Sequence, residues 1–214
     1  MKYRQFRDFV FQLINQYSIC GEPVTERYND YADLEARIPN LLGLAMMNIS
    51  LNGKPITGTL DIDALETAGK LRSLSDGYTE VTLPDDFQRM TGDGIPILHH
   101  GRMARVKGYH LVADKLVIKT ELMRNAIAIE YEKAPRDYAE ILNLEEQDVE
   151  LDGDREQQYA AALFVAAMLV MDDDSFVYAN LMNEYEARVS AMGSRLSAEA
   201  MEINDCMGTE YLYL

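Results

Sequence analysis

A chain of 214 residues with 48% hydrophobic and 26% charged residues can fold around a buried core, and this composition excludes wholesale disorder. Its 36 acidic and 20 basic residues give a net charge of −16. That excess argues against a conventional nucleic-acid-binding protein, which needs basic groups to neutralise phosphates. The two cysteines, Cys20 and Cys206, form no CxxC pair and indicate neither a disulfide framework nor a zinc site.

The apolar segments of the chain are too short to cross a membrane. The longest apolar run, 159–171, falls short of the about 20 residues that span a bilayer. Residues 1–14 lack the layout of a signal peptide because charged residues interrupt the apolar positions. We therefore expect a soluble protein without membrane contact.

The N-terminal quarter of the sequence has helical periodicity. Apolar residues at three- and four-residue spacing predict an amphipathic helix over 3–17. A second apolar stripe predicts a helix over 34–49, which Asp30 or Asp33 could cap. Pro39 lies inside this second segment and predicts a kink or a late helix start, because it lacks a backbone donor.

From residue 55 to residue 135 the pattern changes to short alternating runs separated by glycine and polar residues, which is typical of β-strands. Leu83–Phe87 is interpreted as a strand end that leads into a short helical turn, with Pro84 early in that turn. The predicted strands are 79–83, 104–111, 115–118 and 126–132.

Two further helices are predicted in the C-terminal part. The segment 156–171 is apolar nearly all round and is expected to be the central helix of a bundle. A helix over 175–192 follows, and the two form an antiparallel hairpin. After Gly193 the pattern weakens, and the sequence finishes on an aromatic and apolar segment, 210–214.

These elements predict an α+β fold, a helical bundle of about four helices with an inserted, mostly antiparallel β region. The expected organisation has four parts: N-terminal helices at 1–54, the inserted β-rich region at 55–135, a helical hairpin at 136–193, and a C-terminal tail at 194–214.

Acidic clusters precede both C-terminal helices. Asp172, Asp173 and Asp174 could hold a divalent cation through oxygen ligands, but adjacent residues seldom converge on one ion. Capping of the following helix explains them better, and the same holds for Asp152 and Asp154. No metal site is predicted.

The remaining polar candidates indicate no catalytic chemistry. His99 and His100 are interpreted as part of a surface loop, and His110, in a strand-like run, as structural. Arg102, Arg105 and Lys107 could pair with an acidic neighbouring subunit or a phosphate backbone, although a solvated strand face is favoured.

Phosphate-binding, nucleophile-elbow and zinc-protease motifs are all missing from the sequence. The sequence therefore predicts a protein that is not an enzyme, with no catalytic residue, no cofactor-binding residue and no cofactor.

Four phrases in this order resemble the head-to-tail adaptor (connector or tail-tubular-like) proteins of tailed bacteriophages. They are the helical segment 33–42, the phrase Leu83–Phe87, Glu130-Tyr131 followed by Pro135, and Asn183–Glu186. The resemblance spans residues 30–189 and leaves the segment 92–101 unmatched.

The resemblance implies a structural virion protein. It implies a ring of about twelve subunits that binds beneath the portal, extends the DNA channel and carries the next tail component. Such a protein assembles in the host cytoplasm, is located at the head–tail interface, and lets DNA pass without specific binding.

Two groups of residues receive hypothetical roles from this resemblance. The C-terminal segment of such proteins docks on the portal, which assigns the docking contact to Tyr211, Leu212, Tyr213 and Leu214. The acidic group Asp172–Asp174 would face the channel and repel DNA at short range.

Three other functions stay open at the level of sequence. The chain could be a tail-completion or baseplate component, which would bind tail rather than portal. It could instead be a β-domain binding module that uses the segment 92–101, or an enzyme whose site the sequence does not reveal.

Overall fold

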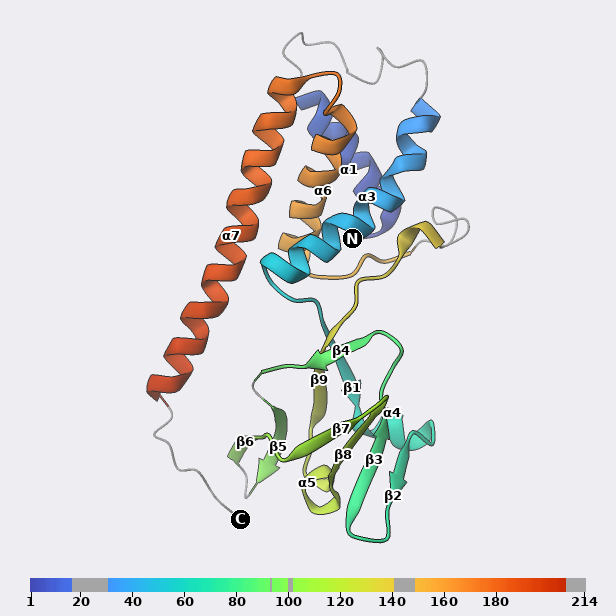
Figure 1. The fold of residues 1–214 in the computed structure, drawn as a ribbon, viewed down its shortest axis with the longest axis vertical. Helices are drawn as coiled ribbons and strands as arrows, with labels where there is room; N and C mark the ends of the chain where they lie inside the picture. Colours follow the sequence, from blue (N-terminus) through green and yellow to red (C-terminus); the bar gives the residue numbers. More distant parts are fainter. Residues whose placement is uncertain (17–30, 93, 100–101, 141–148, 207–214) are drawn as a thin grey trace. The chain divides into compact units, whose positions relative to one another are not determined.

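The computed structural model describes residues 1–16, 31–92, 94–99, 102–140 and 149–206. The chain divides into two compact units (Figure 1). A helical unit comprises Met1–Pro55 and Pro135–Leu214, and a β unit comprises Ile56–Ala134.

The helical unit is organised around one helix, α6. Helices α1, α3 and α7 all pack against α6, and the short 3-10 helix η1 packs against α3. The bounds are Tyr3–Gln16 for α1, Tyr31–Asn52 for α3, Tyr138–Glu140 for η1, Arg155–Val170 for α6 and Ser175–Cys206 for α7.

Helix α6 is buried on nearly every side, as its apolar sequence predicts. Its middle consists largely of small side chains, which let the neighbouring helices approach closely. The buried residues include Ala160, Ala161, Ala162, Leu163, Phe164, Val165, Ala166 and Ala167. The interpretation of this segment as a central helix is therefore confirmed.

Pro39 lies inside α3, which begins eight residues earlier at Tyr31, so a late helix start is wrong. Figure 1 shows the ribbon of α3 bending along its length, which agrees with the kink that the proline predicts. The apolar side of this helix is buried in the core of the helical unit, at Leu34, Ile38, Leu42, Ala45, Met46 and Ile49.

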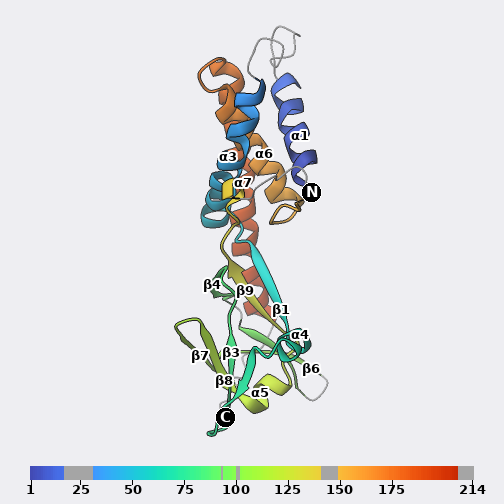
Figure 2. The same ribbon diagram turned by 90° about the vertical axis from the view of Figure 1, so that its right-hand side faces the viewer.

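The β unit contains three separate antiparallel sheets. The first has the strand order β1-β9-β4, the second β2-β3-β8-β7, and the third is the hairpin β5-β6. Figure 2 shows the same ribbon turned by 90°. The strands are β1 (Thr57–Asp61), β2 (Leu71–Ser73), β3 (Tyr78–Thr82), β4 (Phe87–Met90), β5 (Ile95–His99), β6 (Arg102–Val106), β7 (Tyr109–Val112), β8 (Lys115–Lys119) and β9 (Ala128–Lys133).

Alternating strand residues and two short helices form the core of the β unit. The helices are α4 (Ile62–Thr67) and α5 (Thr120–Arg124), and each buries one apolar side chain in this core. The core residues are Leu65, Val81, Leu83, Met90, Ile95, Ile97, Leu116, Ile118, Met123 and Ile129.

The predicted fold class is wrong. The described residues form six α-helices and nine strands in three antiparallel sheets, rather than about four helices around one inserted β region. Two of the helices, α4 and α5, have only six and five residues, too few to show helical periodicity in the sequence.

Two local expectations also fail. Leu83–Phe87 forms no helical turn; it is a tight turn between β3 and β4, closed by a hydrogen bond of 3.0 Å from the Phe87 amide to the Pro84 carbonyl. Helix α7 does not weaken at Gly193 but continues to Cys206, because a glycine lowers helix propensity without ending an otherwise helical segment.

Candidate functional site

The acidic group Asp172–Asp174 lies in the turn between α6 and α7. The Asp174 carboxylate accepts hydrogen bonds from the amides of Phe176 (3.1 Å) and Val177 (3.0 Å) and so caps α7. Asp172 and Asp173 are exposed. The capping interpretation is therefore confirmed for Asp174, and only the other two carboxylates are directed to solvent.

Several sequence candidates cannot be located. Tyr211, Leu212, Tyr213 and Leu214 lie outside the described residues, as does His100. The hypothesis that the C-terminal segment docks on the portal therefore stays a prediction.

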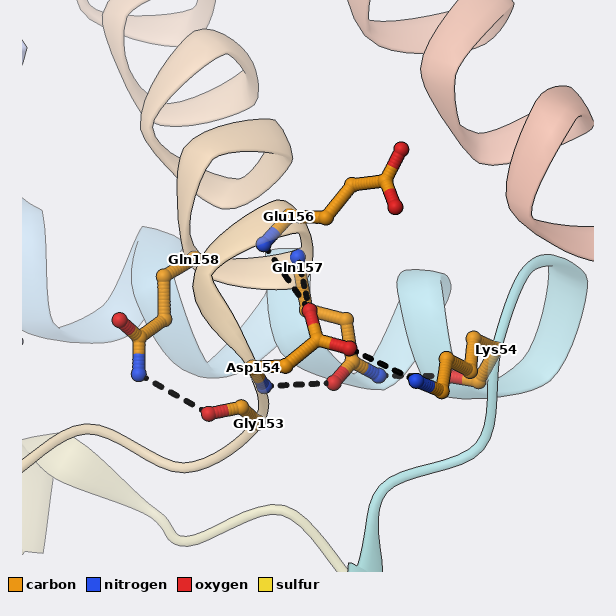
Figure 3. A network of polar contacts seen from close by, with 6 residues as sticks. All are labelled: Lys54, Gly153, Asp154, Glu156, Gln157 and Gln158. Carbon is orange, nitrogen blue, oxygen red and sulfur yellow. Dashed lines mark hydrogen bonds and ion pairs between the residues drawn. The ribbon is translucent and has the colours of Figure 1, made fainter.

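A capping box at the start of α6 connects two parts of the helical unit (Figure 3). The Asp154 carboxylate accepts from the amides of Glu156 and Gln157, both at 2.9 Å. The Gln157 side chain accepts from the Asp154 amide at 2.9 Å and donates to the Lys54 carbonyl at 2.7 Å. This network ties the end of α3 to the start of α6.

The environment of Asp154 favours its charged form. Burial acts to raise the pKa of this carboxyl, but the hydrogen bond from Lys54 and the backbone amides of Gln157 and Glu156 together lower it. Lys54 Nζ lies 2.8 Å from Asp154 Oδ2. The carboxylate is thus an ionised structural cap rather than an acid–base group.

A buried glutamine, Gln158, binds the N-terminal ammonium group, a role that no sequence pattern indicates. The Gln158 side chain accepts from the N-terminal ammonium at 3.0 Å and donates to the carbonyls of Leu151 (3.1 Å), Asp152 (3.3 Å) and Gly153 (3.0 Å). This amide differs from that of a surface glutamine only in being buried. Its burial depends on long-range packing, which the local sequence does not show.

Asp152 is a buried structural residue. Its carboxylate accepts from the Arg136 amide at 3.0 Å, and its own amide donates to the Tyr138 hydroxyl at 2.8 Å. Burial raises the pKa of Tyr138, so this hydroxyl stays protonated. The hydrogen bonds of Asp152 with Arg136 and Tyr138 connect the segment after residue 135 to the start of α6. None of these groups is a nucleophile.

An open pocket of about 610 Å³ lies where α1 meets the start of α6. The rings of Phe9 and Tyr159 lie 5.4 Å apart, and the Arg188 guanidinium lies 4.2 Å from the Tyr159 ring centroid. Side chains of both charge signs surround the pocket, so its lining selects no single class of ligand. The lining residues are Met1, Lys2, Gln5, Phe9, Glu150, Arg155 and Tyr159.

Two phrases that carry the family resemblance meet in the β unit. The Tyr131 hydroxyl donates to the Asp86 carboxylate at 2.9 Å, and the Ala134 amide donates to the Asp86 carbonyl at 2.7 Å. The Tyr131 ring also lies so close to Gly58 that a Cβ there would come within 2.5 Å of Cζ. These contacts give Asp86 and Tyr131 a structural role within the β unit.

An exposed apolar stripe runs along the outer side of α3. Leu44, Met47 and Leu51 follow at helical spacing and are 46%, 53% and 73% exposed. Next to them, a Cβ added at Gly43 would meet no atom within 4 Å, so the surface there is open. We call these three residues the α3 stripe.

The β unit has exposed apolar residues of its own. Leu98 and Met103 are cross-strand partners in the β5-β6 hairpin, and both are at least half exposed. Leu111 and Val112 lie on β7, at one edge of the four-stranded sheet. Apolar exposure is thus present on surfaces of both units.

The basic residues near β6 are only partly available. Arg102, Arg105 and Lys107 are all exposed, and Arg105 pairs with Glu130 of the same unit at 3.0 Å. His110 is exposed on β7, within the strand-like run that the sequence indicates.

The described residues give no positive indication of chemistry. They contain no group of three or more His, Cys, Asp or Glu side chains that could hold a metal ion. Within the same residues, no helix combines the length and apolarity that a membrane span requires. Compared with models of protein families and with curated proteins, the chain matches none.

Proposed function

We propose that this chain is a structural protein of a tailed bacteriophage, a head-to-tail adaptor whose copies form a ring beneath the portal. The observation that carries the proposal is the α3 stripe. Large apolar side chains aligned on one exposed helix face lose their contact with water when a subunit interface covers them, and this stabilises assembly.

Separate apolar surfaces support a ring rather than a symmetric dimer. A closed ring needs two different surfaces per subunit, one for each neighbour, whereas a two-fold dimer needs a single self-complementary surface. Besides the α3 stripe, Leu98 with Met103 and Leu111 with Val112 offer further apolar surface on the β unit. A subunit of this kind can meet two neighbours and the portal or tail.

The charge distribution supports a channel through which DNA passes without binding. The β unit carries 10 basic and 12 acidic residues, and the rest of the chain carries 10 basic and 24 acidic residues. The helical unit therefore holds −14 of the total charge of −16. A surface of this sign repels the phosphates of DNA at short range.

A lysine in the α3 stripe tests the proposal. Met47→Lys should leave the circular dichroism spectrum and unfolding midpoint unchanged, because the side chain is exposed, and it should abolish ring assembly measured by light scattering. The matched control is Met171→Lys, since Met171 is also an exposed methionine but lies at the end of α6, outside the α3 stripe.

Equal assembly by both variants would remove the α3 stripe from the interface. Binding of the ring to tail proteins but never to the portal would favour a tail-completion or baseplate component instead.

A further inference from the structure

The four-stranded sheet of the β unit has two open edges. Within the described residues its strand order is β2-β3-β8-β7, so β2 and β7 each pair there with one neighbour only. Figure 1 shows β2 on the outside of β3, and Figure 2 shows the β7-β8 hairpin projecting from one side of the unit. Edge strands present backbone N–H and C=O groups that can pair with another chain.

Strand β7 lacks two of the features that protect many edge strands, lysine and proline. All but the first of its four residues are exposed, and the strand contains no lysine and no proline. Leu111 and Val112 are 45% and 60% exposed and, as neighbours on a strand, lie on opposite faces of the sheet. An unprotected apolar edge of this kind indicates a pairing site.

The direction of the strands makes β2 of an adjacent copy a suitable partner for β7 in a ring. The three strand pairs of this sheet are all antiparallel, so β2 and β7 run in opposite directions. When successive copies keep nearly the same orientation, as in a ring of many subunits, β7 of one copy runs antiparallel to β2 of the next. A sheet with an even number of strands therefore continues without a break from copy to copy.

We propose that β7 of each subunit pairs with β2 of the adjacent subunit, so that the four-stranded sheets form one continuous belt around the ring. This inference rests on the proposed ring and names the contact that closes it. The short strands, of four and three residues, provide only a few hydrogen bonds per seam. Each single contact is weak for that reason, and many together hold the ring.

Hydrogen exchange of the full-length chain tests the belt directly. Amide exchange is followed by mass spectrometry at a concentration where light scattering gives a monomer and at one where it gives the assembly. We expect exchange of both β2 and β7 to slow by about tenfold or more on assembly. Strands β3 and β8, which are paired on both sides within one subunit, should change little.

A matched pair of variants supplies the second readout. Leu111→Lys places a charge on the β7 edge and should raise the concentration needed for assembly several-fold. Ile127→Lys is the control, because Ile127 has nearly the same exposure, 46%, and precedes the central strand of another sheet. Circular dichroism checks that both variants fold. If Leu111→Lys does not fold, the exchange experiment on the unaltered chain alone tests the belt.

The outcomes separate the belt from the ring itself. A ring whose β2 and β7 amides exchange as fast as in the monomer overturns the belt and leaves the proposed function standing. A two-fold dimer with protection of β7 alone overturns it as well. No assembly under any condition, with or without portal, removes both proposals.

Discussion

At the scale of single residues, the start of α6 depends on the Asp154 cap. Asp154→Ala removes the hydrogen bonds from the amides of Glu156 and Gln157 together with the 2.8 Å ion pair to Lys54, and it should destabilise the protein by about 1 kcal/mol. The measurement is the free energy of unfolding in urea. Asp173→Ala is the control, because Asp173 is exposed and the turn before α7 is capped by Asp174 instead.

The pH dependence of this cap has a definite sign. The folded protein lowers the pKa of Asp154 below its ordinary value of 3.8. A lowered pKa contributes stability that is fully present above about pH 3.8 and is lost as the pH falls through the folded value. The stability difference between the unaltered chain and Asp154→Ala should therefore shrink below pH 3.8; a difference that grows there would contradict this role of the carboxylate.

Gly58 has no room for a side chain. A Cβ there would lie 2.5 Å from Cζ of Tyr131, a buried ring that is also held by the hydrogen bond to Asp86. Gly58→Ala should destabilise the β unit by roughly 1–3 kcal/mol, measured by thermal unfolding. Gly92→Ala is the control, because a Cβ there meets no atom within 4 Å, and an equal loss in both variants would contradict the steric argument.

At the scale of elements, the turn before α7 separates a structural residue from two candidates for the channel. Asp174 caps α7, so a variant that neutralises all three aspartates would also destabilise the helix. A loss of function in that variant could not be assigned to the exposed carboxylates. The double variant Asp172→Asn with Asp173→Asn should leave unfolding and ring formation unchanged and should slow DNA release from assembled particles. Unchanged release kinetics would remove the channel role of these two carboxylates.

Long amphipathic or apolar helices could be predicted from the sequence because their signal is spread over many residues. The predicted helices at 3–17 and 156–171 agree with α1 (Tyr3–Gln16) and α6 (Arg155–Val170) to within one residue at each end. The sequence also predicts strands β3 and β8 from short β-type runs. In β3, Val81 lies between two polar residues, and in β8 the buried residues Leu116 and Ile118 lie two positions apart.

Short elements without such a signal could not be predicted. Strand β1 reads Thr-Gly-Thr-Leu-Asp, and its place is fixed by pairing with β9, far away in the sequence. The predicted run 104–111 covers parts of two strands, β6 and β7. They are separate strands because Lys107 and Gly108 between them belong to no strand. The correct number of sheets depends on these long-range pairings, which local periodicity does not contain.

The candidate site was predictable only in part. The aspartates at 154 and 174 could be identified as caps from their positions before apolar helices. Gln158 and the α3 stripe could not, because each depends on which side of a helix the fold buries. The sequence of α3 alone does not separate Met46, which is fully buried, from Met47, which is half exposed.

At the scale of the whole molecule, the proposed ring would have to form against the repulsion between negatively charged copies. Most of the negative charge lies in the helical unit, and apolar surfaces lie on both units. The charges repel DNA and other copies over a distance set by salt, whereas apolar contacts are insensitive to it. Raising the salt concentration from low to physiological should therefore promote assembly, and light scattering across a salt series checks this directly.

The most direct test of the central claim is the light-scattering mass of the purified chain, alone and mixed with a portal protein encoded by the same genome. The account predicts a complex whose mass corresponds to one portal and a ring of about twelve added copies. A chain that stays monomeric in both samples, at concentrations where phage assembly proceeds, would contradict the adaptor function.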